Sequence, residues 1–179
     1  MTVVRDATPE DGAACAAIYR PYVTDTVITF EDEPPTAEDM VRRIVAAQER
    51  HAWLVLEDDA AGGGGRVVGY AYAAPVKERA AYRWACEVSV YLEQGRRRGG
   101  AGRALYTALF DRLAARGYRR LVAGMTLPNP ASEGLHRAMG FEPIGVQRRI
   151  GWKHGGWHDV AWVQRPLGPE DDAAPTGLE

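Results

Sequence analysis

The chain has 179 residues, 46% of them hydrophobic and 26% charged, with a formal net charge of −2. This length fits one domain that can bury a core without disulfides or metals. The near-neutral charge gives no basic surface for nucleic acid, and no apolar run reaches the ~20 residues that a membrane span needs. The start of the chain lacks the regions of a signal peptide. We therefore expect a cytoplasmic single domain over residues 1–167, binding neither nucleic acid nor membrane, and a disordered acidic tail over 168–179.

Cysteine and histidine usage argues against disulfides and metal sites. Cys15 and Cys86 are too few and too far apart for a disulfide scaffold, and we expect them to be reduced and buried. His154 and His158 have the spacing of metal ligands on a helix, but two glycines lie between them. Glycines disfavour a helix, so we expect no metal.

Capping and breaking residues predict the elements of the first fifty positions. Residues 3–4 indicate a short strand. A helix begins after Thr8, a capping residue followed by proline and acids, and Pro21 is expected to end it. Thr36 begins a second helix in the same way. The polar, β-branched stretch between the helices, residues 24–35, is expected to form a loop that helps to wall a substrate site.

Two β-rich segments, 53–56 and 67–73, predict paired strands around Gly62–Gly65. This glycine run is read as a hairpin loop, because no Gly-Lys-Ser/Thr follows it. The remaining pattern predicts a strand over 86–91, a helix over 100–116, a strand over 121–125, a short helix over 131–139 and two strands around Gly155-Gly156. The resulting order, β-α-α-β-β-β-α-β-α-β-β, predicts an α/β fold with one mixed sheet and helices on both faces.

The turn after the 86–91 strand carries the strongest functional signal. It reads Arg96-Arg97-Arg98-Gly99-Gly100-Ala101-Gly102 and leads directly into a helix. Unpaired N–H groups at a helix start, together with the helix dipole, form an anion site suited to a diphosphate. Arg97 and Arg98 add charge at its rim. A glycine-rich helix entry with a solvated basic turn is the alternative, and a dinucleotide-binding turn fits less well because its third glycine is missing.

Several motifs together resemble one enzyme family. Arg97-x-x-Gly100-x-Gly102 after a strand resembles the acetyl-CoA signature of the GNAT acyltransferase superfamily, and Asn129-x-x-Ser132-x-x-Leu135-His136-x-x-x-Gly140-Phe141 resembles its next segment. Pro75–Tyr82, Glu87–Tyr91 and Lys153–Asp159 are similar to the phosphinothricin and methionine sulfone/sulfoximine N-acetyltransferases. The likeness covers roughly residues 3 to 167, so it is more than a single motif.

The resemblance implies a fold, a cofactor and a partner. It implies a mostly antiparallel sheet with a β-bulge in the 86–91 strand, which splays that strand from its neighbour. It also implies an acetyl-CoA site and a homodimer. The expected acetyl-CoA contacts are Ser89, Val90, Tyr91, Arg97, Arg98, Gly99, Gly100, Ala101, Gly102, Asn129 and Ser132.

Glu87 is the candidate general base for deprotonating an amine. On an unbroken strand, Glu87, Ser89 and Tyr91 face one side while residues 86, 88 and 90 face the other. A carboxylate in a β-branched strand is unexpected without a purpose. The alternative is an ion pair with Arg79 or Arg83.

His136 is the second catalytic candidate, because the resemblance places the general acid there and its ordinary pKa lies near neutrality. A histidine packed near the cofactor is the alternative reading, and Tyr106 is another possible donor. Lys77, Arg79, Tyr82 and Glu87 are the expected contacts of a small anionic amino-acid-like substrate. The alternative for Lys77 and Arg79 is that they form, with Glu78 and Arg83, a solvated charged loop.

The function predicted from these residues is transfer of an acetyl group from acetyl-CoA to the amine of such a substrate, for example phosphinothricin or methionine sulfoximine. Two other functions remain open at this point. One is acetylation of a peptide or protein amine, and the other is a non-catalytic acyl-CoA-binding module.

Overall fold

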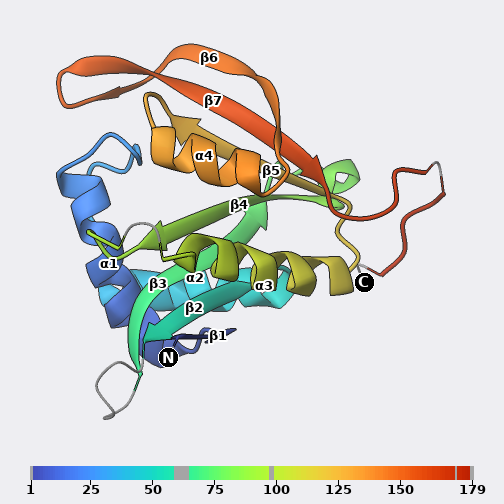
Figure 1. The fold of residues 1–179 in the computed structure, drawn as a ribbon, viewed down its shortest axis with the longest axis horizontal. Coiled ribbons are helices and arrows are strands. Elements are labelled where there is room, and N and C mark those ends of the chain that lie inside the picture. Colours follow the sequence, from blue (N-terminus) through green and yellow to red (C-terminus); the bar gives the residue numbers. More distant parts are fainter. Residues whose placement is uncertain (1, 59–64, 97–98, 172, 178–179) are drawn as a thin grey trace.

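The computed structural model describes residues 2–58, 65–96, 99–171 and 173–177. It contains one seven-stranded sheet in the order β1-β2-β3-β4-β5-β7-β6, in which only β4 and β5 pair in parallel, with helices on both faces (Figure 1). The fold is therefore the predicted mixed, mostly antiparallel α/β sheet. Its strands are β1 (Thr2–Asp6), β2 (Trp53–Asp58), β3 (Arg66–Pro75), β4 (Ala85–Leu92), β5 (Arg120–Thr126), β6 (Glu142–Lys153) and β7 (Gly156–Pro166), and its α-helices are α1 (Gly12–Thr24), α2 (Ala37–Arg50), α3 (Ala101–Ala115) and α4 (Pro130–Ala138).

The helix starts follow their capping residues. Thr36 and Asp39 form a reciprocal capping box at the start of α2, with Asp39 N–H donating to Thr36 Oγ1 over 3.1 Å. Thr8 begins a short 3₁₀ turn, Pro9–Asp11, that leads into α1. These pairs satisfy N–H groups that a helix leaves free, so local sequence sets these two boundaries.

The predicted end of the first helix was wrong. The helix continues through Pro21 to Thr24. Proline removes one backbone hydrogen bond and normally breaks a helix. Here the last turn buries Val23 to 1% exposure and brings Tyr22 against Tyr91, with ring centroids 5.1 Å apart. Burial of this turn therefore outweighs the missing bond.

The sheet separates two hydrophobic cores. α1 and α2 cover one face, where Ile44 and Met40 pack with Trp53 and Tyr70. α3 covers the other, where Leu105 and Leu109 pack under β2, β3 and β4. The two buried cysteines are divided between these cores and are free, as predicted.

β6 and β7 form a long hairpin that arches away from the body above α4 (Figure 1). β6 is the edge strand, and its register with β7 shifts twice. The chain after β7 contains no helix or strand in its described part, 167–171 and 173–177. Disorder of this tail and the domain boundary at residue 167 stay predictions. Among the helices the structure describes, none is long and apolar enough to cross a membrane.

Candidate active site

β4 and β5 separate just beyond their first residues. They pair only through Ala85–Arg120, Cys86–Leu121 and Glu87–Val122, although β4 continues to Leu92 and β5 to Thr126. The far sides of both strands stay paired, β4 with β3 and β5 with β7. The strands therefore enclose a gap, and among the described strands none pairs with the backbone of Val88–Tyr91 on the side facing β5.

The β3–β4 register runs without a shift from Gly69–Leu92 to Pro75–Cys86. The pairing therefore does not show the bulge that the resemblance implied, although the splay is present. Side chains alternate as predicted: Cys86 and Val88 belong to the α3 core, while Tyr91 packs with the α1 core. Because Glu87 shares the parity of Tyr91, it faces the α1 side of the sheet.

Glu87 lies at the point where the gap opens and is half-buried. Burial raises the pKa of its carboxyl above 4.5, while the positive charge of Lys77 opposes this. In the described part of the chain, the ion pairs do not include Glu87, so the pairing with Arg79 or Arg83 is not observed. A carboxyl with a raised pKa and no ion-pair partner is suited to accept a proton.

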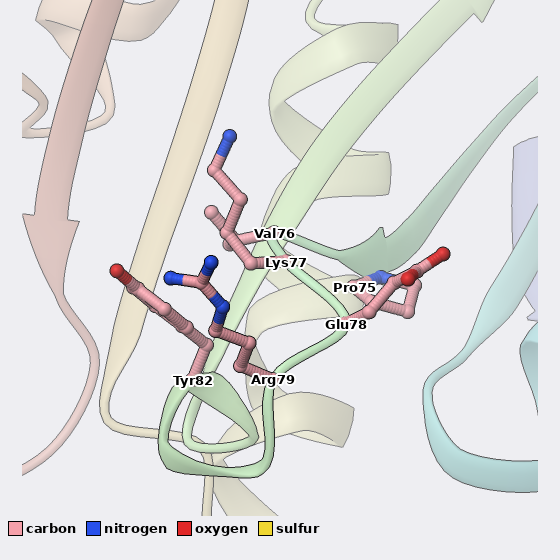
Figure 2. Close-up of a pocket in the computed structure, with 6 residues that line it drawn as sticks. All are labelled: Pro75, Val76, Lys77, Glu78, Arg79 and Tyr82. Atoms are coloured by element: carbon pink, nitrogen blue, oxygen red, sulfur yellow. The ribbon is translucent and has the colours of Figure 1, made fainter.

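A pocket of about 720 Å³ lies at the loop between β3 and β4. Its lining includes Lys77, Arg79 and Tyr82, all three predicted as substrate contacts. Figure 2 shows these three side chains directed to one side of the loop, with Glu78 pointing away. The pocket thus offers two cations and a phenol to an anionic group, although the Glu78 carboxylate also belongs to its lining. Glu87 is not in the lining and is linked to this pocket through the charge of Lys77.

The turn before α3 has an open approach for an anion. Gly100 is the N-cap of α3 in the left-handed conformation, with φ +73°, and a Cβ there would meet no atom of the described residues within 4 Å. A Cβ on Gly102 would instead lie 3.1 Å from the Leu135 side chain. Gly100 therefore sets the turn, whereas Gly102 allows α4 to pack against α3. Gly99 also has open surroundings, but Arg97 and Arg98 lie outside the described residues.

Asn129 and Ser132 form the start of α4. The Ser132 backbone N–H donates to Asn129 Oδ1 over 3.2 Å, so Asn129 is the helix cap. The cap anchors the short helix beside the gap. The roles of Asn129 and Ser132 as acetyl-CoA contacts stay predictions.

His136 lies inside the α3–α4 interface and is 4% exposed. Its Nδ1 lies 2.8 Å from the Ser132 carbonyl oxygen, and its Nε2 lies 3.0 Å from the Tyr106 hydroxyl. A carbonyl only accepts, so we assign the proton to Nδ1, and Tyr106 then donates to Nε2. Burial lowers the pKa of His136 below 6.5, which favours this neutral form. The geometry thus favours the packed histidine over the proton donor.

Tyr72 and Lys153 were missed from the sequence. Burial raises the pKa of Tyr72; a hydrogen bond with Ser89 opposes this, and the charges of Glu87 and Glu31 add to it. Tyr72 thus lies among groups from β4 and the α1–α2 loop. The sequence predicted the strand over 67–73 but not which residues surround Tyr72. Lys153 belongs to the segment Lys153–Asp159 that carried the family resemblance, but the sequence gave it no role of its own.

Comparisons with known proteins agree with this geometry. The family described as "Acetyltransferase (GNAT) domain" matches residues 4–162. Phosphinothricin N-acetyltransferase of Streptomyces viridochromogenes is 40% identical over 162 residues, covering 90% of this chain and 86% of that protein. The L-methionine sulfoximine/L-methionine sulfone acetyltransferase of Pseudomonas paraeruginosa is 32% identical over 170 residues, covering 95% and 97%.

A solved structure shows the same fold. The GNAT phosphinothricin acetyltransferase of Sinorhizobium meliloti, in complex with AcCoA, superposes with a TM-score of 0.91 at 38% identity, over 98% of this chain and 93% of that one. Family match, sequence identity and fold all agree over nearly the whole chain. This chain therefore belongs to the GNAT acetyltransferase family and lies close to its phosphinothricin and methionine sulfoximine acetyltransferases.

Proposed function

We propose that this protein transfers the acetyl group of acetyl-CoA to the amino group of a small amino-acid-like acceptor, such as phosphinothricin, methionine sulfoximine or methionine sulfone. The main support is Glu87, half-buried where β4 and β5 separate, with its pKa raised by burial. The related enzymes described above are named for these acceptors.

Glu87 acts as the general base in this proposal. It takes a proton from the acceptor ammonium, directly or through one water, and the freed amine attacks the thioester carbonyl carbon. The new N–C bond forms as the C–S bond breaks, and the thiolate leaves. Free backbone groups along Val88–Tyr91 orient the acyl donor in the gap, and the turn at Gly99–Gly102 binds its diphosphate. These residues fit acetyl-CoA because the gap offers an unpaired strand edge and the turn is open to an anion.

We further propose that the thiolate takes its proton from water and that His136 serves to hold α4 against α3. Both ring nitrogens of His136 are already engaged inside the protein. Tyr106→Phe should lower the free energy of unfolding by about 1–3 kcal/mol, because Nε2 loses its buried donor. In the same variant kcat should change little. A large fall in kcat with unchanged stability would instead mean that Tyr106 and His136 supply the proton to the leaving thiolate.

Acetyl-CoA-dependent thiol release with a panel of acceptors tests the proposed function. The panel comprises phosphinothricin, methionine sulfoximine, methionine sulfone, unmodified amino acids and decarboxylated analogues of each. We expect turnover with at least one analogue and weaker turnover once its carboxylate is removed, because Lys77 and Arg79 bind anions. Turnover with peptide amines alone would favour the peptide-acetylating alternative. Acetyl-CoA binding without turnover would favour the binding module.

Lys77→Met tests the link between the anion pocket and Glu87. The charge of Lys77 lowers the pKa of Glu87, whereas burial raises it. Removing this charge should therefore raise the pKa of Glu87 further. The base is then deprotonated only at higher pH, and the acidic limb of the kcat–pH profile should move upward. Arg83→Met, on the same exposed loop, removes an equal charge and should leave the limb in place. If the acidic limb does not move in Lys77→Met, Lys77 does not influence the pKa of the general base.

A homodimer is our proposal for the assembly, and exposed hydrophobic side chains of the β6–β7 hairpin support it. Five large hydrophobic side chains there are between 47% and 58% exposed: Ile144, Val146, Ile150, Trp152 and Trp157. Four of them lie on the edge strand β6 and Trp157 lies on β7, and exposed apolar side chains in such number are typical of an interaction surface. Light scattering should give twice the 19.6 kDa chain mass, and the chain mass alone would contradict the proposal.

A further inference from the structure

Lys153, the last residue of β6, is only 4% exposed although it carries a charge. Its Nζ donates to three backbone carbonyl oxygens: Val23 at 2.7 Å, Thr29 at 2.8 Å and Glu31 at 2.8 Å. An ammonium has three N–H donors, so each donor has one acceptor. Val23 belongs to the last turn of α1, whose carbonyls lack helical partners and carry negative dipole charge. Lys153 thus joins the hairpin to the end of α1 and to the loop that follows.

The chemistry of this contact requires lysine. Among 22 Lys and Arg residues, lysine occurs only at positions 77 and 153. A guanidinium is a planar fork, whereas an ammonium directs three hydrogens from a single nitrogen. Three carbonyls around one nitrogen therefore match lysine and not the arginine that the chain uses elsewhere.

A second contact holds the same loop, Asp25–Thr36, which we term the acceptor loop. A Cβ on Gly151 of β6 would lie 2.2 Å from the ring of Phe30 in this loop. The Phe30 ring also lies near His158 of β7, with centroids 6.3 Å apart. Only a glycine at position 151 allows Phe30 to lie directly on the strand. The hairpin therefore holds the acceptor loop at two points, and Figure 1 shows the loop after α1 near the hairpin turn.

The acceptor loop also reaches the Glu87 face of the sheet. Glu31 accepts two hydrogen bonds of 2.8 Å from Arg43 and one of 3.0 Å from the Tyr19 hydroxyl. Tyr19 packs edge-on against Tyr91 of β4, with centroids 4.8 Å apart. The charges of Glu31 and Glu87 both act on Tyr72. An amine that approaches Glu87 from this face therefore meets the loop that Lys153 holds.

We propose that Lys153 is a positioning residue that fixes the acceptor loop over the Glu87 face and thereby shapes the amine-binding side of the site. This inference rests on the proposed function. Lys153 touches no substrate in this arrangement, because its three donors are all used within the protein. Its effect is on acceptor binding, while the acetyl-CoA turn at α3 lies on a different element.

Lys153→Met and Lys153→Arg test the proposal, with Arg20→Met on the exposed side of α1 as the control for charge removal. Hydrogen exchange should accelerate in residues 25–36 of both Lys153 variants and not in the control. The KM for the amine should rise about tenfold, as expected when positioning groups are displaced, while the KM for acetyl-CoA stays within about twofold. Full rescue by arginine would overturn the requirement for a single-nitrogen donor.

Gly151→Ala provides a second test that leaves Lys153 in place. Its Cβ displaces Phe30, so exchange in residues 25–36 and the KM for the amine should both rise. If the Lys153 variants fail to fold, this variant still tests whether the hairpin positions the acceptor loop for amine binding. Unchanged exchange in the loop would overturn the inference, as would faster exchange with an unchanged KM for the amine. Absence of turnover in the unmodified protein would instead refute the proposed function, while the exchange data would still test the loop contact.

Discussion

Glu87→Gln should lower kcat for the amine acceptor about 10²-fold or more, because an amide cannot accept the ammonium proton and general base catalysis is typically worth 10²–10⁴-fold. The KM for acetyl-CoA should change little, since the turn before α3 is untouched. Initial-rate measurements of thiol release with both substrates varied will separate these effects. Glu49→Gln is the matched control, because Glu49 is an exposed carboxylate near the end of α2 and does not line the pocket.

The same variant should keep or gain stability near neutral pH. Burial holds the pKa of Glu87 above 4.5 in the folded protein, so the folded state favours the neutral carboxyl. Stability contributed by this group is therefore lost as pH rises from 4.5 through the folded pKa, and glutamine does not suffer that loss. Thermal unfolding at pH 5 and pH 8 should show the variant gaining relative to the parent at pH 8. Lower stability at both pH values would indicate a structural partner for Glu87, and undiminished turnover would remove it from the base role.

Gly100→Val should raise the KM and Kd for acetyl-CoA about 10- to 100-fold. Gly100 adopts φ +73° at the N-cap of α3, a conformation that β-branched residues avoid. The turn must rearrange, and its N–H groups then no longer point at a diphosphate. One hydrogen bond to a charged group is worth about 1.5–3 kcal/mol, and each 1.4 kcal/mol is a factor of ten. Isothermal titration with acetyl-CoA measures the change.

Gly155→Val controls for backbone strain alone. Gly155 has φ +75°, and a Cβ there also has open surroundings, but it lies in the hairpin turn between β6 and β7. Both substitutions should lower stability by a similar amount, about 1–2 kcal/mol for left-handed strain. Only Gly100→Val should weaken acetyl-CoA binding. Equal weakening in both variants would mean that general destabilisation, and not the turn, is responsible.

Local sequence was sufficient where a short-range interaction decides the structure. Thr36 and Asp39 cap α2 within one turn, and the alternation along 86–91 correctly placed Glu87 opposite the α3 core. The prediction that α1 ends at Pro21 was wrong because tertiary packing outweighs the effect of the proline. Burial of Val23 and contact with Tyr91, far along the chain, keep the last turn of α1 helical. A short stretch of sequence around Pro21 does not include Tyr91, so it cannot predict this contact.

The sequence by itself determined the fold class, the glycine turn and the membership of Lys77, Arg79 and Tyr82 in one loop, because these depend on periodicity, spacing and contiguity. Only the tertiary structure decided how far β4 and β5 separate, which groups contact the His136 ring, and what Lys153 holds. Each depends on partners distant in sequence, such as Tyr106 for His136 and Thr29 for Lys153. A buried polar group takes its role from the partners that satisfy it, and those partners are set by folding.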